Sequence, residues 1–202
     1  MYRFSHFRFL VATLSLAACV PIGRTIYQPI DHEGYRYTSC SGAKESAYRQ
    51  IDGDTVYAVT TESGDRTLLS VHLALYIRPG AKLRFKTDQI ALYGNGLERV
   101  VTIEAVHSWR RNQETGYLEE TQYLATDWLI GYQGSGGPLF DFLSKDWENW
   151  GPYWIHIDFE GIESEQVNVV LPELATGDGS MHPKPISLKR QFDVFLLDPF
   201  CT

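Results

Sequence analysis

Short segments with the two-residue period of β-strands recur along this chain, and no segment shows a sustained helical period. Residues 68–77 form a nearly continuous apolar run, which is typical of a central strand. Residues 82–87 alternate strictly, with basic side chains on one face and Leu83 and Phe85 on the other, which predicts a half-buried strand. Similar patterns predict further strands at residues 55–61, 97–109, 153–159, 166–171 and 192–197.

Turn signals such as Arg78-Pro79-Gly80 and Gly94-Asn95-Gly96 separate these segments. About seven or eight short strands joined by Gly, Pro and Asp turns predict an all-β fold, specifically an immunoglobulin-like β-sandwich. We expect this sandwich to form one domain over residues 35–202. Residues 110–152 interrupt the pattern with a Gly-rich stretch and many aromatic side chains, so we interpret them as a long aromatic-rich insertion.

The N-terminus has the features of a bacterial export signal. Arg3 and Arg8 precede a short apolar run that is too short to span a bilayer. The run ends in Leu16-Ala17-Ala18-Cys19, which resembles the lipobox of bacterial lipoproteins at all four positions. The alternative is an ordinary signal peptide in which the cysteine is incidental.

The lipobox resemblance implies that residues 1–18 are removed and that Cys19 carries lipid chains. Several acyl chains hold a protein in a membrane far more firmly than one, because each buried CH₂ contributes about 0.8 kcal/mol. Residues 19–34 contain several Pro and Gly residues without a clear period, which predicts an irregular lipidated tether. The residue after the cysteine is Val20 rather than Asp, which by the same resemblance favours the outer membrane, with the domain facing the periplasm.

The charge composition of the chain narrows the kinds of molecule that it is expected to bind. Loss of Arg3 and Arg8 with the signal reduces the basic residues from 18 to 16, against 25 acidic residues, and the mature net charge becomes −9. An acidic domain of this kind lacks the electrostatic footprint of a nucleic-acid-binding protein. The expected partners are therefore the membrane, through Cys19, and an envelope protein or peptidoglycan.

Two cysteines remain once Cys19 is assigned to the lipid. In an oxidising compartment Cys40 and Cys201 are candidates for a disulfide that would link the start of the domain to its end. Two free thiols are the alternative. The sequence contains no CxxC and no HExxH pattern, so we expect no metal site and no cofactor.

One segment resembles a catalytic motif. Ser135-Gly136-Gly137-Pro138-Leu139 is similar to the nucleophile segment of chymotrypsin-like serine proteases. That resemblance implies a histidine and an aspartate behind Ser135, and the sequence offers His72 or His107 with Asp88 or Asp127. The alternative is a Gly-rich loop that must turn sharply.

Two groups of side chains could form binding surfaces. Aromatic residues crowd the predicted insertion, and we single out a possible binding surface formed by Trp128, Tyr132, Trp147 and Trp150. The same residues could instead cap an open end of the sandwich. The basic residues Arg78, Lys82, Arg84 and Lys86 could meet an anionic partner, although such alternation is commonly the solvated face of a strand.

Together these features predict a lipid-anchored envelope protein with a non-catalytic binding or structural role. Two alternatives stay open. The first is a serine hydrolase that uses Ser135, and the second is an accessory subunit of an envelope secretion or transport assembly.

Overall fold

A computed structural model describes residues 21–37, 44–63, 67–112, 114–134 and 149–196. Every regular element within these ranges is a β-strand. No helix in this part of the chain is long and apolar enough to cross a membrane. The signal peptide, Cys19, Cys40 and Cys201 lie outside the described residues, and so do Ser135 and Trp147.

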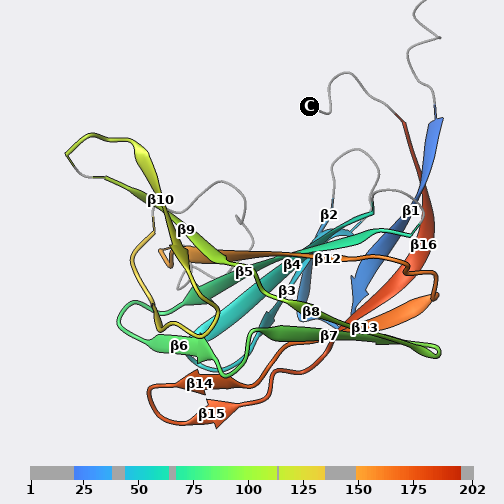
Figure 1. Cartoon of the computed structure of the whole chain (residues 1–202). Coiled ribbons are helices and arrows are strands. Elements are labelled where there is room, and N and C mark those ends of the chain that lie inside the picture. The colour runs from blue at the N-terminus through green and yellow to red at the C-terminus, as the bar shows by residue number, and fades with distance from the viewer. Residues whose placement is uncertain (1–20, 38–43, 64–66, 113, 135–148, 197–202) are drawn as a thin grey trace, which may run out of the picture.

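The largest sheet has seven antiparallel strands in the order β10-β9-β12-β5-β4-β3-β2. It forms the upper layer in Figure 1. Its strands are β2 (Gly34–Tyr37), β3 (Lys44–Gln50), β4 (Thr55–Ser63), β5 (Leu69–Ile77), β9 (Val106–Arg111), β10 (Leu118–Tyr123) and β12 (Pro152–Phe159).

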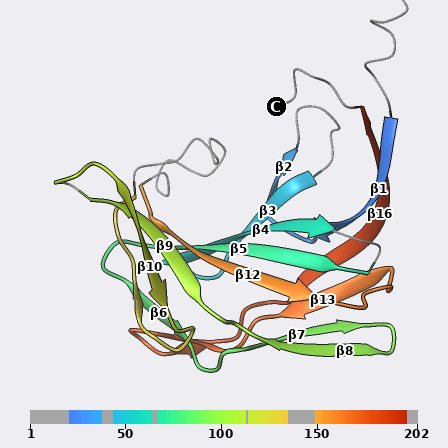
Figure 2. The ribbon, with the colours of Figure 1, turned by 45° about the horizontal axis from the view of Figure 1, so that its top comes forward.

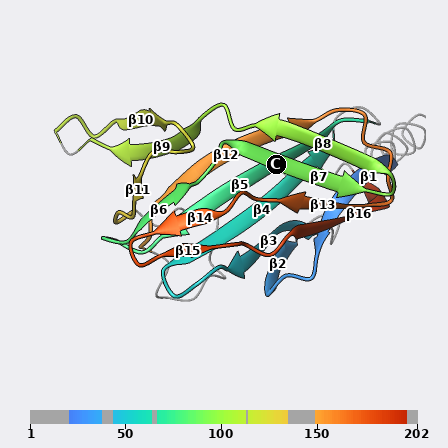
Figure 3. The same cartoon turned by 60° about the horizontal axis from the view of Figure 1, so that its bottom comes forward.

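Two smaller sheets form the opposite layer, which Figure 3 shows from below. The five-stranded sheet runs β1-β16-β13-β7-β8 and the four-stranded sheet runs β11-β6-β14-β15. The five-stranded sheet comprises β1 (Pro21–Ile30), β7 (Gln89–Gly94), β8 (Leu97–Thr102), β13 (Gln166–Val170) and β16 (Ile186–Leu196). The four-stranded sheet comprises β6 (Lys82–Phe85), β11 (Leu129–Ile130), β14 (Leu174–Thr176) and β15 (Ser180–Met181).

The main hydrophobic core lies between these layers. It combines inward side chains of the large sheet, such as Leu73 and Phe159, with Leu92, Leu188 and Phe85 of the smaller sheets, and all five are fully buried. Alternate residues of a strand point to opposite faces, so each sheet contributes one apolar face to the core. The predicted all-β sandwich is therefore confirmed. The immunoglobulin-like detail stays a prediction.

The predicted tether is wrong for most of its length. Residues 21–30 form β1, which pairs with β16 along its whole length. Tyr27 is buried, and its hydroxyl donates a hydrogen bond to the carbonyl oxygen of Ser164. Pro21 and Pro29 hid this strand from sequence reasoning. Proline is tolerated in a strand at the edge of a sheet, which is the position of β1.

One predicted strand is divided in two. Residues 97–109 were expected to form a single strand, but β8 ends at Thr102 and β9 begins at Val106. The two strands belong to different sheets, so the chain passes from one layer to the other between them. The described part of the predicted insertion contains the end of β9, all of β10 and the short strand β11. Residues 135–148 are not described, and the insertion as a whole stays a prediction.

Candidate functional site

The outward face of the seven-stranded sheet carries a group of titratable side chains that contact one another. Antiparallel pairing of β5 and β12 sets His72 opposite His156 and Ser70 opposite Asp158. Directly opposed residues share a face, and their neighbours Leu73, Ile155 and Ile157 point into the core. Glu62 comes from β4, where it pairs with Ser70. We call Glu62, Ser70, His72, His156 and Asp158 the outer-face cluster.

Hydrogen bonds connect four members of this cluster into a chain. The hydroxyl of Ser70 donates to Oδ1 of Asp158 at 2.5 Å. Oδ2 of Asp158 lies 3.1 Å from Nε2 of His156. Nδ1 of His156 lies 3.1 Å from Nδ1 of His72, and the two rings are 4.4 Å apart. Nε2 of His72 is 3.8 Å from Oε2 of Glu62, an electrostatic contact rather than a hydrogen bond.

The geometry limits the positions that protons can take on the two histidines of the cluster. A carboxylate only accepts, so Nε2 of His156 must donate to Asp158. The contact between the two Nδ1 atoms needs one donor and one acceptor. The pair can therefore hold one positive charge with its hydrogen bond intact, whereas protonation of both rings removes the acceptor and brings two like charges together.

The pKa shifts agree with this arrangement. Burial, followed by the neighbouring His156, lowers the pKa of His72 below its ordinary value of 6.5. The hydrogen bond from Ser70 is the main cause that lowers the pKa of Asp158, with His156 acting in the same direction. The Ser70 hydroxyl donates to the Asp158 carboxylate and makes no contact with either histidine of the cluster. The cluster is suited to binding polar groups.

Aromatic side chains extend the same face toward the start of β12. His107 on β9 pairs in register with Trp154 on β12 and stacks on Trp109, with ring centroids 5.9 Å apart. Nδ1 of His107 lies 2.5 Å from Oε1 of Glu120. Towards β3 and β4 the face is apolar, with Trp154 and Tyr48 packed against the buried residues Val56, Ala58, Ala74, Tyr76 and Trp150. The outer face therefore offers polar groups beside a large aromatic area.

Trp128, Tyr132 and Trp150 of the predicted aromatic surface pack against different parts of the protein. Trp128 lies beneath the guanidinium of Arg84, which is 4.8 Å from the ring centroid. Tyr132 lies beneath Arg110 at 4.0 Å and donates to the carbonyl oxygen of Pro152. Trp150 is buried in the apolar part of the outer face. Each of the three described residues thus has its own set of neighbours, and a shared binding surface with Trp147 stays a prediction.

Three of the four basic residues Arg78, Lys82, Arg84 and Lys86, the predicted basic stripe, contact other side chains of the protein. Lys86 forms a 2.6 Å ion pair with Glu173, and Arg78 forms one of 2.9 Å with Asp54. Arg84 covers Trp128. These contacts favour the interpretation of the stripe as a solvated strand face.

Residues proposed for hydrolase chemistry are only partly described. His72 contacts His156 and Glu62, while His107 contacts Glu120. Asp127 accepts a hydrogen bond from the backbone of Leu124 in a turn. Ser135 lies outside the described ranges, so the hydrolase alternative stays a hypothesis. Within those ranges, no three His, Cys, Asp or Glu side chains are arranged to hold a metal ion.

No family model matches this chain, and neither a curated protein nor a solved structure is significantly similar to it. The outer-face cluster must therefore be interpreted from its own geometry. Its strands were predicted from the sequence, and His156 and Asp158 share a face by their spacing. Their alignment with His72 and Ser70 depends on the register between β5 and β12, which the strand patterns do not specify.

Proposed function

We propose that this chain is a lipid-anchored protein of the bacterial envelope, held in the outer membrane through Cys19, which acts by binding rather than by catalysis. The observation that carries the proposal is the position of the lipobox. The pattern Leu16-Ala17-Ala18-Cys19 ends two residues before β1, which begins at Pro21. Cleavage before Cys19 would release the signal peptide and leave every described strand intact.

The binding role is supported by the outer face of the large sheet. His156 and Asp158 keep about half of their side-chain surface exposed, at 52% and 48%, although they are hydrogen-bonded to each other. Trp154 lies two residues before His156 on the same face of β12, partly buried against the apolar cluster, and aromatic rings at a surface favour recognition. An envelope protein or a peptidoglycan fragment would find both hydrogen-bonding groups and aromatic area on this face.

Lipid attachment is tested with the intact chain expressed in a bacterium. We expect the mature protein to float with membranes and to show by mass spectrometry the loss of residues 1–18 and the addition of acyl chains. Cys19→Ala should abolish the acylation and release the protein from membranes. Cys201→Ala is the matched control, because it removes a cysteine at the other end of the chain and should keep the lipid. A wild-type protein without acyl chains would disprove the anchor.

The binding surface is tested by site-specific crosslinking in native envelopes. A photoreactive residue in place of His156 samples the outer face, and one in place of the exposed Val100 on β8 samples the opposite layer. A product that forms from position 156 and not from position 100 supports this surface. One reproducible protein in that product would make the chain a subunit of an envelope assembly. Equal products from both positions, or none from either, would contradict the proposed surface.

A further inference from the structure

The hairpin formed by β9 and β10 exposes three large apolar side chains close together in sequence. Tyr117 is 76% exposed, Leu118 is 64% exposed and Trp109 is 43% exposed. Leu118 pairs with Arg111, next but one to Trp109, so Leu118 and Trp109 share one face of the hairpin. Tyr117 lies directly before β10. Exposed apolar side chains that lie close together are typical of a surface that contacts a protein or a membrane.

The end of the hairpin has a defined shape. The backbone N–H of Asn112 donates to the carbonyl oxygen of Tyr117, and the N–H of Gly116 donates back to Asn112. The side chain of Asn112 accepts hydrogen bonds from the N–H groups of Glu114 and Thr115. Gly116 has a φ of 73°, a conformation that favours glycine. Tyr117 and Leu118 follow directly after these hydrogen-bonded residues.

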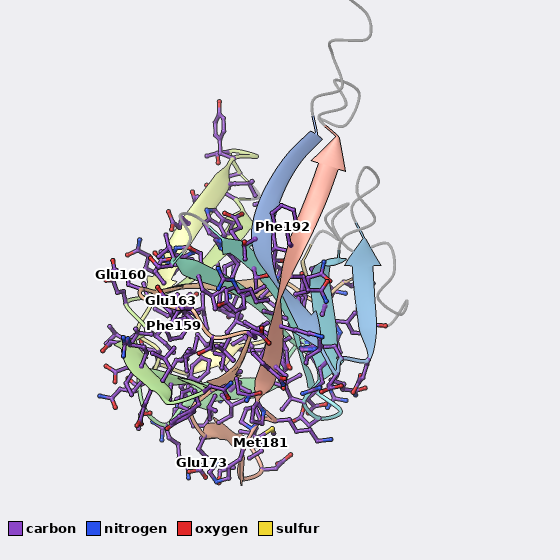
Figure 4. All side chains as sticks on the ribbon, turned by 90° about the vertical axis from the view of Figure 1, so that its right-hand side faces the viewer. Phe159, Glu160, Glu163, Glu173, Met181 and Phe192 are labelled. Carbon is purple, nitrogen blue, oxygen red and sulfur yellow. The ribbon has the colours of Figure 1, made fainter. Side chains whose placement is uncertain are left out.

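The hairpin and the anchored end of the domain lie on the same side of the molecule. In Figure 1 the turn of β9–β10 and the start of β1 both lie toward the top of the molecule, and Figure 2 shows that they stand at its two opposite ends. The side view in Figure 4 agrees and places the exposed Phe192 on β16 beside β1. Cys19 is two residues from Pro21, so a lipid on Cys19 would lie within about 7 Å of the first strand. The bilayer would then face the side toward which the hairpin turn points.

The chemistry of the turn fits the interface between lipid headgroups and acyl chains. Trp and Tyr are enriched in that layer because they join an apolar ring to a polar group, and Leu enters it readily. Of the three carboxylates nearby, Glu119 accepts a hydrogen bond from the Asn112 amide and Glu120 contacts His107, while Glu114 is exposed in the turn and would stay at the level of the headgroups. Arg111 donates to the carbonyl oxygen of Gly116, which keeps a cation at the turn.

We propose that Trp109, Tyr117 and Leu118 insert into the same bilayer that holds Cys19, so that the domain stands on the membrane at two points. This inference rests on the proposed lipid anchor. The second contact can be weak, because the anchor makes it intramolecular and raises the effective concentration of lipid at the hairpin. The net charge of −9 in the mature chain makes apolar insertion, not attraction to anionic lipid, the basis of the contact.

The test uses the lipidated full chain in vesicles of phosphatidylcholine, with and without bromine on the acyl chains near the headgroups. Bromine quenches tryptophan fluorescence only at short range. We expect brominated lipid to quench the wild-type protein and Trp109→Phe to lose most of that quenching. Trp128→Phe is the matched control, since Trp128 is 42% exposed, before β11, and should leave the quenching unchanged. Tyr117→Ser/Leu118→Ser should weaken the quenching while Trp109 is still present.

The outcomes separate this inference from the anchor itself. Flotation of the vesicles reports the anchor, and a protein that fails to float overturns the proposed function. A protein that floats but whose quenching is absent, or is the same in wild type and Trp109→Phe, overturns the hairpin contact alone. In that case the exposed side chains face a protein partner or a second copy of the chain.

Discussion

The two faces of the seven-stranded sheet are built from the same strands but have different surroundings: the inner face packs in the main core, and the outer face carries the outer-face cluster. Along β5, alternate residues are Leu69, Val71 and Leu73, which are fully buried in the core, while Ser70 and His72 between them point outward. Burial of the inner face supplies the hydrophobic stabilisation of the fold. The outer face of β5 is mixed, because His72 is partly exposed whereas Ala74 and Tyr76 are buried in a second, smaller apolar cluster. The two-residue period thus places the main core on one face and the polar outer-face cluster on the other.

The comparison also shows which face tolerates change. Inner side chains fit between two layers, so their loss leaves a cavity that the neighbours fill only in part. Outer side chains lose hydrogen bonds whose partners can turn to water. We therefore expect substitutions on the inner face to lower the free energy of unfolding strongly, and substitutions in the outer-face cluster to lower it less and to change its pH dependence.

The largest effect is expected from Leu73→Ala on the inner face. Leu73 is completely buried, and truncation of such a leucine costs about 2–5 kcal/mol of unfolding free energy. Leu118→Ala removes the same atoms from a side chain that is 64% exposed, and should change stability by about 0.5 kcal/mol or less. Urea denaturation of the unlipidated domain measures both. Equal effects would contradict the division between the faces.

A smaller effect is expected from Asp158→Ala on the outer face. The substitution removes the acceptor of the Ser70 hydroxyl, which is nearly buried, and the partner of His156 Nε2. We expect a loss of about 1 kcal/mol, the usual contribution of such a bond. Glu160→Ala, at the exposed residue after β12, is the control and should have little effect. A loss as large as that of Leu73→Ala would show that the cluster is part of the core.

The smallest effect is a change in pH dependence. Burial lowers the pKa of His72, so the unfolded chain takes up this proton more readily than the folded protein. The contribution of His72 to the free energy of unfolding is therefore greatest above pH 6.5. It decreases as the pH falls below that value, until His72 is protonated in the folded state too. His72→Gln should flatten this part of the stability profile, with His182→Gln as the control. If His72→Gln left the slope of unfolding free energy against pH unchanged, His72 would not be the source of this pH dependence.

The alternation of apolar and polar residues was sufficient to predict several strands. It located β4, β5, β6, β12 and β13 closely, because each has a clear buried face. It covered only the end of β16 and missed β2, β3 and β7, although β7 has a buried face. It also missed β1, whose prolines suggested a tether, and β10, in which five of the six residues are exposed. A strand without a buried face leaves no hydrophobic period, so only its pairing with a neighbour reveals it.

The candidate sites divide in the same way. The lipobox is a local motif, and its residues predict the proposed anchor without any knowledge of the fold. The outer-face cluster could not be predicted, because His72 and His156 are 84 residues apart and meet through strand pairing. Likewise Trp128, Tyr132 and Trp150 are close in sequence, but the structure gives each a different neighbour.

The sequence by itself determined the all-β class of this protein and the positions of several of its buried strands, since both follow from the local period of apolar side chains. The tertiary structure alone decided which strands became neighbours, which outward residues met, and on which side of the molecule β1 and the β9–β10 hairpin lie. Those features depend on register and on packing between layers, which join residues far apart in the chain.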